Sequence, residues 1–316
     1  MTGSLDTVLE GLRAAAEPTR LRLLALCAEG ELTVSELVQI VGQSQPRVSR
    51  HLKLLCEAGL LARLPEGSWV FYRLAGGGGR ANGLVRQIAD LIPRDDAQLA
   101  RDRERLAAVR AARAERAAAY FRANAENWDS IRALHVDDAE VDKRLLAALP
   151  PARVAGELLD VGTGTGKVLE LFGKRGVKVT GVDASLDMLR VARANLAKAG
   201  LADAHVRQAD MYRLPFDAHA FAAVVFHQVL HFADDPAAAI AEAARVLAPG
   251  GRLVVVDFAP HDLDELRARH AHRRLGFADA EIRGWLAAAK LAPAEPVALP
   301  GNKLTVCLWA ADRPNA

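Results

Sequence analysis

The chain has 316 residues, of which 51% are hydrophobic and 25% are charged, and 41 basic residues against 39 acidic ones give a net charge of +2. This composition is ordinary for a globular protein with room for two domains, and a nearly neutral chain can carry only a local basic surface. Three scattered cysteines exclude a disulfide framework. No apolar run reaches the roughly 18 residues of a membrane span, and the N-terminus lacks a charged-then-apolar leader, so we expect a cytoplasmic protein.

Residues 1–75 show the pattern of a small helical domain that ends in a hairpin. Ser44 and Pro46, soon after Gly42, predict the start of a new helix, because Ser caps helix N-termini and Pro fits the first turn. Two short helices joined by such a turn are a helix-turn-helix, and the two strands that follow predict a β-hairpin wing. The expected helices span 5–16, 18–27, 33–41 and 44–56, and the expected strands span 61–64 and 69–74.

The segments 44–53 and 57–61 resemble the winged-helix repressors of the ArsR/SmtB family, and the resemblance extends over about residues 5–92. It implies a homodimer, held together by a helix at 84–92, that binds a double-stranded DNA operator. Arg can read guanine and Gln adenine in the major groove, while Ser and Lys hold phosphates. A solvated charged face is the alternative interpretation. The predicted DNA-binding residues are Ser44, Gln45, Arg47, Ser49, Arg50 and Lys53 on the second helix, and Arg63 and Arg73 in the wing.

The metal ligands of that family have no counterparts here. Its arsenic and cadmium sensors carry Cys-Val-Cys where this chain has Thr33-Val34-Ser35, and hydroxyls cannot replace soft thiolate ligands. The helix at 84–92 contains no His. We therefore expect no metal, and we expect Cys27 and Cys56 to be core residues rather than a redox pair.

A connecting segment follows the wing. The four glycines at 76–79 predict a flexible break, and 96–126 is rich in Ala, Arg and Glu without Gly or Pro, which predicts a long helix. Leu99, Leu106 and Val109 give this helix a thin apolar stripe, as suits packing against one partner.

A glycine-rich turn at 158–166 follows an apolar strand and reads Asp160-x-Gly162-x-Gly164-x-Gly166. Glycines allow the backbone to pass close to a ligand. A dinucleotide fingerprint needs a glycine at position 167, where this chain has Lys. A P-loop needs a glycine five positions before Gly166 and a Ser or Thr after the Lys, where this chain has Val161 and Val168. By itself the pattern also fits a plain tight turn.

Four further segments follow in order: a strand at 177–183 that ends in Asp183, an acid at Asp210, a strand at 222–226 and a turn and strand at 245–257. Together they resemble class I S-adenosylmethionine-dependent methyltransferases. The resemblance implies that Asp183 accepts hydrogen bonds from both ribose hydroxyls and Asp210 from the adenine amino group. Tyr120 and Trp128, which lie in a segment like the family's lead-in helix, either cover the cofactor or pack between domains. The predicted cofactor-binding residues are Asp160, Gly162, Thr163, Gly164, Gly166, Asp183, Met188, Asp210, Met211, His227, Tyr120 and Trp128.

Two histidines are the candidate catalytic residues. His227 follows the fourth strand, where a general base can act in a doubly wound fold, and His231 is expected one helical turn later. A hydrogen-bonded structural role is the alternative for each, and no third ligand suggests a metal. Arg273 and Arg274 suit an acidic or phosphate-bearing acceptor, or else form a solvated helix face. The domain resembles the small-molecule methyltransferases of ubiquinone biosynthesis.

These observations predict an α/β chain with a winged helix-turn-helix domain at 1–92, a helical connector at 93–130 and a Rossmann-like class I methyltransferase domain at 131–316. The expected function is that of a DNA-binding transcription regulator that also methylates a small molecule, with S-adenosylhomocysteine as the product. One alternative is a non-catalytic sensor, in which S-adenosylmethionine or S-adenosylhomocysteine sets the DNA affinity. The other is an enzyme whose winged helix only dimerises.

Overall fold

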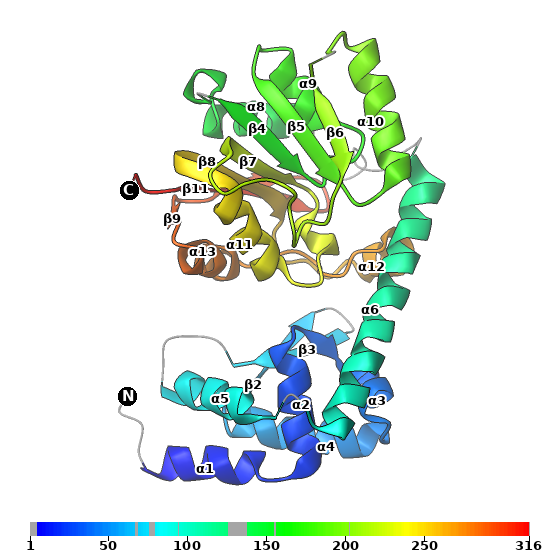
Figure 1. Ribbon diagram of the computed structural model, residues 1–316, viewed down its shortest axis with the longest axis vertical. Coiled ribbons are helices and arrows are strands. Elements are labelled where there is room, and N and C mark those ends of the chain that lie inside the picture. Colours follow the sequence, from blue (N-terminus) through cyan, green and yellow to red (C-terminus); the bar gives the residue numbers. More distant parts are fainter. Residues whose placement is uncertain are drawn as a thin grey trace. The chain divides into compact units, whose positions relative to one another are not determined.

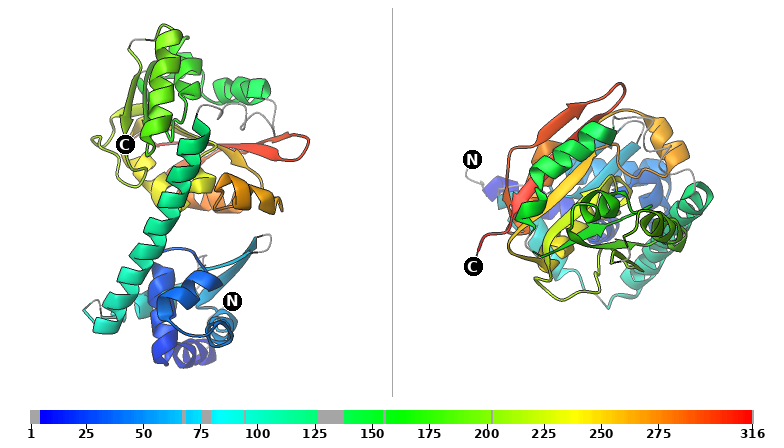
Figure 2. Two further views of the ribbon diagram at one scale, coloured as in Figure 1. Left: turned by 90° about the vertical axis from the view of Figure 1, so that its right-hand side faces the viewer. Right: turned by 90° about the horizontal axis from the view of Figure 1, so that it is seen from above.

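The computed structural model describes residues 5–66, 69–75, 80–93, 95–125, 138–154, 156–201 and 203–315. The chain divides into two compact units, Met1–Arg116 and Ala117–Ala316, which are described separately below. Helix α6 (Ala97–Asn124) contributes residues to both units (Figures 1 and 2). Trp128 and the four glycines at 76–79 lie outside the described residues. Within the described ranges, no helix is both long and apolar enough to cross a membrane.

Unit 1 is a winged helix-turn-helix, as the sequence predicts. Strands β1, β3 and β2 form a three-stranded sheet in that order, and β2 and β3 pair in antiparallel fashion as the wing. The elements are α1 (Leu5–Ala15), α2 (Pro18–Ala28), β1 (Leu32–Thr33), α3 (Val34–Val41), α4 (Gln45–Glu57), β2 (Leu61–Glu66), β3 (Trp69–Leu74) and α5 (Arg80–Leu91).

The two helices of the motif have different ends. Thr33 and Glu36 form a capping box on α3, with each side chain accepting from the other residue's backbone N–H at 3.3 and 2.9 Å. Gly42 ends α3 with φ of 70°, in the left-handed region that glycine tolerates best. Ser44 occupies the N-cap position of α4, but its side chain makes no capping hydrogen bond. The position was predicted correctly, and the expected capping bond is absent.

Helix α6 packs on unit 1 through polar as well as apolar contacts. The apolar stripe of Leu99, Leu106 and Val109 is buried, as expected. Asp102 is also buried, and Arg22 of α2 donates to both of its carboxylate oxygens at 2.6 and 2.7 Å. Further along α6, Arg105 donates to the carbonyl of Ile40 and Arg113 pairs with Glu36, so α6 touches both ends of α3.

Unit 2 is a doubly wound α/β domain, as the sequence predicts. Its described strands form one sheet in the order β10-β11-β8-β7-β4-β5-β6, with β9 paired to β11 (Figure 1). Strands β4 to β8 run parallel, and β10 and β11 are antiparallel. The elements are α8 (Asp138–Ala148), η2 (Pro151–Arg153), β4 (Glu157–Val161), α9 (Lys167–Gly173), β5 (Lys178–Asp183), α10 (Leu186–Lys198), β6 (His205–Gln208), β7 (Phe221–His227), η3 (Leu230–Phe232), α11 (Pro236–Val246), β8 (Leu247–Phe258), α12 (Asp264–His270), α13 (Asp279–Ala288), β9 (Ala292–Pro293), β10 (Val297–Pro300) and β11 (Thr305–Asp312).

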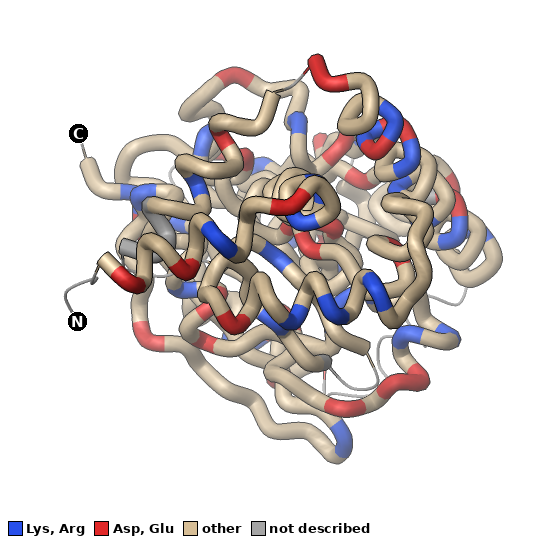
Figure 3. Tube along the Cα trace, turned by 90° about the horizontal axis from the view of Figure 1, so that it is seen from below, with Lys and Arg blue, Asp and Glu red and all other residues tan. Residues whose placement is uncertain are grey.

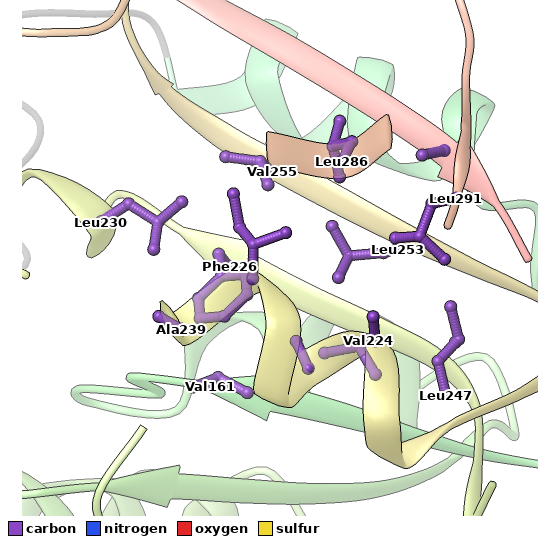
Figure 4. Close-up of a cluster of buried hydrophobic side chains, with 14 of the residues drawn as sticks. Val161, Val224, Phe226, Leu230, Ala239, Leu247, Leu253, Val255, Leu286 and Leu291 are labelled. Carbon is purple, nitrogen blue, oxygen red and sulfur yellow. The ribbon is translucent and has the colours of Figure 1, made fainter. Parts of the chain in front are cut away.

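Alternate residues of the central strands enter two hydrophobic clusters, one on each face of the sheet. One cluster joins β7 and β8 to α11 and α13, and Figure 4 shows Phe226, Val255 and Leu230 within it. Leu230 belongs to the short helix η3, so this cluster anchors the segment that follows β7. The other cluster joins the same strands to α8 and α9. The carboxyl ends of the parallel strands are thereby held on a rigid frame.

Candidate functional site

The glycine-rich turn lies at the carboxyl end of β4. Gly162, Gly164 and Gly166 have φ of 73°, 53° and 86°, which side-chain-bearing residues rarely adopt. The N–H groups of Gly162 and Thr163 donate to the carbonyl of Val182 at 2.8 and 2.9 Å, so the turn is tied to β5. A Cβ added to Gly162 would lie 2.3 Å from Val229 Cγ2. A glycine is therefore required at position 162 by the backbone geometry and by the packing on Val229.

Asp183 ends β5 beside that turn. Its Oδ2 accepts from Gly164 N–H at 2.9 Å and its Oδ1 accepts from Ser185 N–H at 2.8 Å. Burial raises the pKa of Asp183, and these backbone hydrogen bonds counteract part of that rise. Each oxygen keeps a lone pair beyond those bonds, so the carboxylate can accept two further hydrogen bonds.

The other residues predicted to bind the cofactor differ in how deeply they are buried. Asp160 and Thr163 are buried at the end of β4, and Met188 is buried in α10. Asp210 is exposed just after β6, and the preceding Ala209 donates its N–H to the carbonyl of Asp183 at 3.1 Å. Asp183 and Asp210 thus lie at one edge of the sheet. Met211 is partly buried.

Tyr120 lies against α12. Its hydroxyl is 2.8 Å from His270 Nδ1, and the neighbouring Phe121 packs edge-to-face on Phe232 with ring centroids 4.9 Å apart. Burial raises the pKa of Tyr120. A role for Tyr120 in covering the cofactor remains a prediction.

A buried histidine–carboxylate pair lies at the ends of η3 and β8. His231 Nδ1 is 2.8 Å from Asp257 Oδ1, and the two residues are 2% and 0% exposed. Asp257 also accepts from the backbone N–H groups of His231 and Phe258, at 3.2 and 2.8 Å. A carboxylate only accepts hydrogen bonds, so Nδ1 carries the proton and Nε2 has the free lone pair. This is the arrangement of an oriented general base.

Aromatic rings and backbone bonds hold His231 in place. His272 stacks on it with ring centroids 4.0 Å apart, and Phe232 and Phe258 lie at 4.1 and 5.3 Å. The N–H groups of Arg273 and Arg274 donate to the carbonyl of His231 at 2.9 and 3.0 Å. Fixed neighbours of this kind preserve one ring orientation.

The structure corrects two expectations about this region. His227 is the last residue of β7 and His231 lies on the 3₁₀ helix η3, so the predicted one-turn α-helical relation between them is wrong. The chain leaves β7 through Gln228, whose φ is 53°. Arg273 pairs with Asp234, and the buried Arg274 pairs with Glu281, both at 3.1 Å. These arginines are therefore not a solvated helix face.

Helix α4 presents the predicted DNA-binding residues of unit 1. Val48, Leu52 and Leu55, which share one face of α4, are fully buried. Lys53 forms a 3.8 Å pair with Glu57 on the same helix. Figure 3 shows basic and acidic positions spread over the trace, in keeping with a small net charge. The predicted DNA-binding residues lie at the start of α4 and on the face away from this buried stripe. Ser49 is half-buried, and the exposed residues are Ser44, Gln45, Arg47, Arg50 and Lys53.

The two wing arginines differ. Arg63 is exposed and lies opposite Tyr72 on the paired strand. Arg73 is partly buried and pairs with Glu31 at 3.2 Å, which ties β3 to the residue before β1. Arg73 is thus engaged within the fold of unit 1.

The residues that replace the thiolates of the metal-sensing relatives have a structural use. Thr33 caps α3, as described above, and Ser35 is the second residue of that helix. No group of three metal-binding side chains occurs among the residues that the structure describes. Cys27 and Cys307 are buried, Cys56 is half-buried, and all three are free thiols. Burial raises the pKa of both Cys27 and Cys56, which makes them poor thiolates.

Comparison with known proteins identifies both units. Residues 17–63 match the family described as bacterial regulatory protein, arsR family, and residues 159–255 match the family described as methyltransferase domain. The chain carries an arsR-family helix-turn-helix and a methyltransferase domain.

The chain is 41% identical over 108 residues to the ubiquinone/menaquinone biosynthesis C-methyltransferase UbiE of Desulfotalea psychrophila, a match that covers 34% of this chain and 43% of that protein. It is 51% identical over 61 residues to the arsenical resistance operon repressor of Escherichia coli K12, which covers 19% of this chain and 52% of the repressor. The chain thus spans about half the length of these curated relatives. The geranyl diphosphate C-methyltransferase of Streptomyces coelicolor A3(2) shares the fold of the methyltransferase domain, with a TM-score of 0.50, 20% identity, and coverage of 56% of this chain and 78% of that one.

Sequence reasoning missed two polar groups of the methyltransferase domain. Asp257 was not predicted as a partner of His231, because its 26-residue separation from His231 matches no local pattern. Gln228 was not singled out. Adjacent parallel strands bring their carboxyl ends together. A prediction that β7 and β8 are neighbours would therefore have placed Gln228 and Asp257 close together.

Proposed function

We propose that this chain is a DNA-binding transcription regulator whose second unit transfers a methyl group from S-adenosylmethionine to a hydroxyl of a small molecule. The observation that carries the proposal is the buried His231–Asp257 pair beside the glycine-rich edge. A protein that only senses the cofactor has no use for an oriented base. The pair therefore favours an enzyme over the sensor.

The residues at the carboxyl ends of β4, β5 and β6 suit the cofactor. Asp183 has lone pairs for two ribose hydroxyls after binding Gly164 and Ser185. Asp210 lies at the same edge and suits the adenine amino group. The glycine turn with Asp160 suits the amino-acid end, since left-handed glycines bring the backbone close to a ligand. We also retain Thr163, Met188, Met211, His227 and Tyr120 as predicted cofactor contacts.

When bound, S-adenosylmethionine supplies a methyl group on a sulfonium, and transfer breaks the carbon–sulfur bond, forms an oxygen–carbon bond and leaves the electron pair on a neutral thioether sulfur. His231 Nε2 takes the proton of the acceptor hydroxyl. Asp257 keeps Nδ1–H in place and balances the charge of the imidazolium that forms. His231 is only 2% exposed, so methyl transfer requires a local opening that lets the acceptor reach Nε2.

For unit 1, we propose a homodimer that reads a two-fold symmetric operator with α4. Helices α1 and α5 expose apolar side chains that suit a second copy: Leu5 is 76% and Leu91 is 81% exposed. Val8, Leu9 and Leu12 of α1 are also exposed. Exposed Arg47 and Arg50 would reach the bases, and Lys53 a phosphate. Action on an operator places the protein in the cytoplasm.

The test combines cofactor binding, methyl transfer and DNA binding. Calorimetry should detect S-adenosylmethionine and S-adenosylhomocysteine, and protein incubated with methyl-labelled cofactor and a small-molecule extract of the host cell should label a product. His231→Asn should retain cofactor binding and lose the labelling. Promoter DNA should bind in a salt-sensitive manner. Cofactor binding without labelling, combined with DNA affinity that changes on cofactor addition, would establish the sensor instead.

A further inference from the structure

Two arginines from other elements hold the end of α3, directly before the turn that leads into α4. The last carbonyl groups of a helix have no partner within that helix. Arg105 of α6 donates to the carbonyl of Ile40 at 2.9 Å, and Arg22 of α2 donates to the carbonyl of Val41 at 3.0 Å (Figure 1). Both guanidinium groups also lie at the negative end of the α3 dipole, which favours cations. The turn before α4 is therefore fixed by α2 and α6.

Asp102 of α6 orients the arginine that comes from α2. Its two carboxylate oxygens accept from Arg22 at 2.6 and 2.7 Å, and its side chain is 1% exposed. Asp102 and Arg105 are three residues apart, so they lie on the same side of α6. Leu106 and Val109, each one turn further on, are buried on that side as well. One face of α6 thus acts on both carbonyl groups, directly through Arg105 and indirectly through Asp102.

The start of α4 depends on this turn. Only residues 42–44 separate α3 from α4, and the Ser44 side chain makes no capping hydrogen bond. Gly42 has φ of 70°, and a Cβ added to it would lie 3.2 Å from Arg105 Nη1, so Arg105 also packs on the turn itself. Arg47, a predicted base-reading residue, is exposed in the first turn of α4. The placement of the turn therefore decides where Arg47 meets the DNA.

The α6 side of these contacts lies outside the part of the chain that matches the regulator family. The match to the arsR family covers residues 17–63, whereas α6 begins at Ala97. Arg22, α3 and α4 are inside the matched range, and Asp102 and Arg105 are outside it. The family match therefore accounts for α4 but not for the helix that holds the turn before it.

We propose that Asp102 and Arg105 of α6 are positioning residues for DNA recognition, which hold the turn between α3 and α4 and thereby set the placement of α4 on the operator. This inference rests on the proposed DNA-binding function of unit 1. Neither residue has to touch DNA. Their loss lowers the discrimination between operator and other DNA, because discrimination depends on base contacts from α4, whereas non-specific binding depends on phosphate contacts.

The experiment measures the affinity of the full chain for two duplexes: an operator that the wild type selects from a random double-stranded library, and poly(dI-dC). Arg105→Ala should lower the ratio of the two affinities about tenfold, as expected for one lost charge-assisted hydrogen bond. Arg105→Lys should restore most of the ratio, because an ammonium also donates to a carbonyl. Arg101→Ala is the matched control and should keep the ratio, because Arg101 is an exposed arginine of α6 that donates to Gln98 of the same helix.

A double variant separates positioning from stability. Removal of one partner of a buried ion pair destabilises a fold, whereas replacement of both partners by apolar residues is often neutral or stabilising. Arg22→Met combined with Asp102→Leu should therefore melt near the wild-type temperature. It should still lose operator preference, because the donor to the Val41 carbonyl is gone. Arg105 is exposed, so its variants test the inference whether or not the double variant folds.

Several results would overturn the inference. A wild-type affinity ratio in Arg105→Ala would show that α4 does not depend on this contact, and an equal loss in Arg101→Ala would assign the effect to charge alone. A uniform loss on both duplexes with a smaller salt dependence would show that Arg105 itself binds a phosphate. Failure of the wild type to select any operator would instead refute the proposed regulator.

Discussion

Helix α4 of unit 1 and the edge of the unit 2 sheet that carries Asp183, His231 and Asp257 depend on the sequence in opposite ways. Helix α4 exposes its predicted DNA-binding side chains within ten consecutive residues, and only the buried stripe beneath them and the turn before them depend on the rest of unit 1. The edge collects Asp183, His231 and Asp257 from β5, η3 and β8, which the sheet brings together. A surface of the first kind should respond gradually to substitution. A site of the second kind should fail when one orienting contact is lost.

The largest expected effect is at Asp257. In Asp257→Asn the side-chain amide can donate to His231 Nδ1 and stabilise the wrong tautomer, so we expect methyl transfer to fall by about 10³–10⁴-fold. S-adenosylhomocysteine affinity should change little, because β7 and β4 separate the strand of Asp257 from the strand of Asp183, the proposed ribose contact. Single-turnover transfer to a substrate of the wild type measures the effect. Asp262→Asn, at an exposed position nearby, is the control, and comparable rates in both variants would refute the role of Asp257.

Asp183→Ala tests the proposed cofactor contact at the end of β5. It should weaken S-adenosylmethionine binding by about 1.5–3 kcal/mol, because it removes a charged acceptor for the ribose hydroxyls. Burial raises the pKa of Asp183, so as pH falls the wild-type carboxylate is neutralised earlier than an ordinary aspartate, and affinity should decline with it. Calorimetry across acidic pH measures both effects. Asp217→Ala, exposed and outside the edge, should bind as the wild type does, and an Asp183 variant that matches it would exclude the assignment.

Arg50→Ala should act more gently on DNA. Loss of one base-reading guanidinium should cost about 1–3 kcal/mol and relax sequence preference at one position of the half-site. Lys53→Ala should weaken binding to all sequences alike, because a phosphate contact carries no base information. Titration of operator variants at fixed salt separates the two outcomes. Identical profiles for both variants would show that Arg50 does not read a base.

The wing should give the smallest effects. Arg63→Ala should lower the salt dependence of DNA binding by about one unit of slope, as expected for one lost phosphate contact. Arg73→Ala should leave that slope unchanged and reduce stability by about 0–1 kcal/mol, because it removes the partly exposed pair with Glu31. Salt titrations and thermal melts distinguish them. A change in the salt dependence of DNA binding in the Arg73 variant would show that Arg73 contacts DNA.

The sequence by itself determined the parts of this protein that depend on local pattern. The recognition helix follows from the turn at Gly42, Pro46 and the buried stripe of α4, all of which act within a few residues. The glycine turn and the acid that ends β5 follow from strand patterns and from glycine's tolerance of positive φ. Both fold classes were therefore predictable.

The tertiary structure decided how the polar side chains are paired. His231 meets Asp257 because β7 and β8 are adjacent and parallel, a relation that no local spacing encodes. Arg73, which is predicted to contact DNA, pairs with Glu31, 42 residues away in the sequence. Backbone propensities act over a few residues, whereas the partner of a buried charge or amide depends on which distant strands the fold brings beside it.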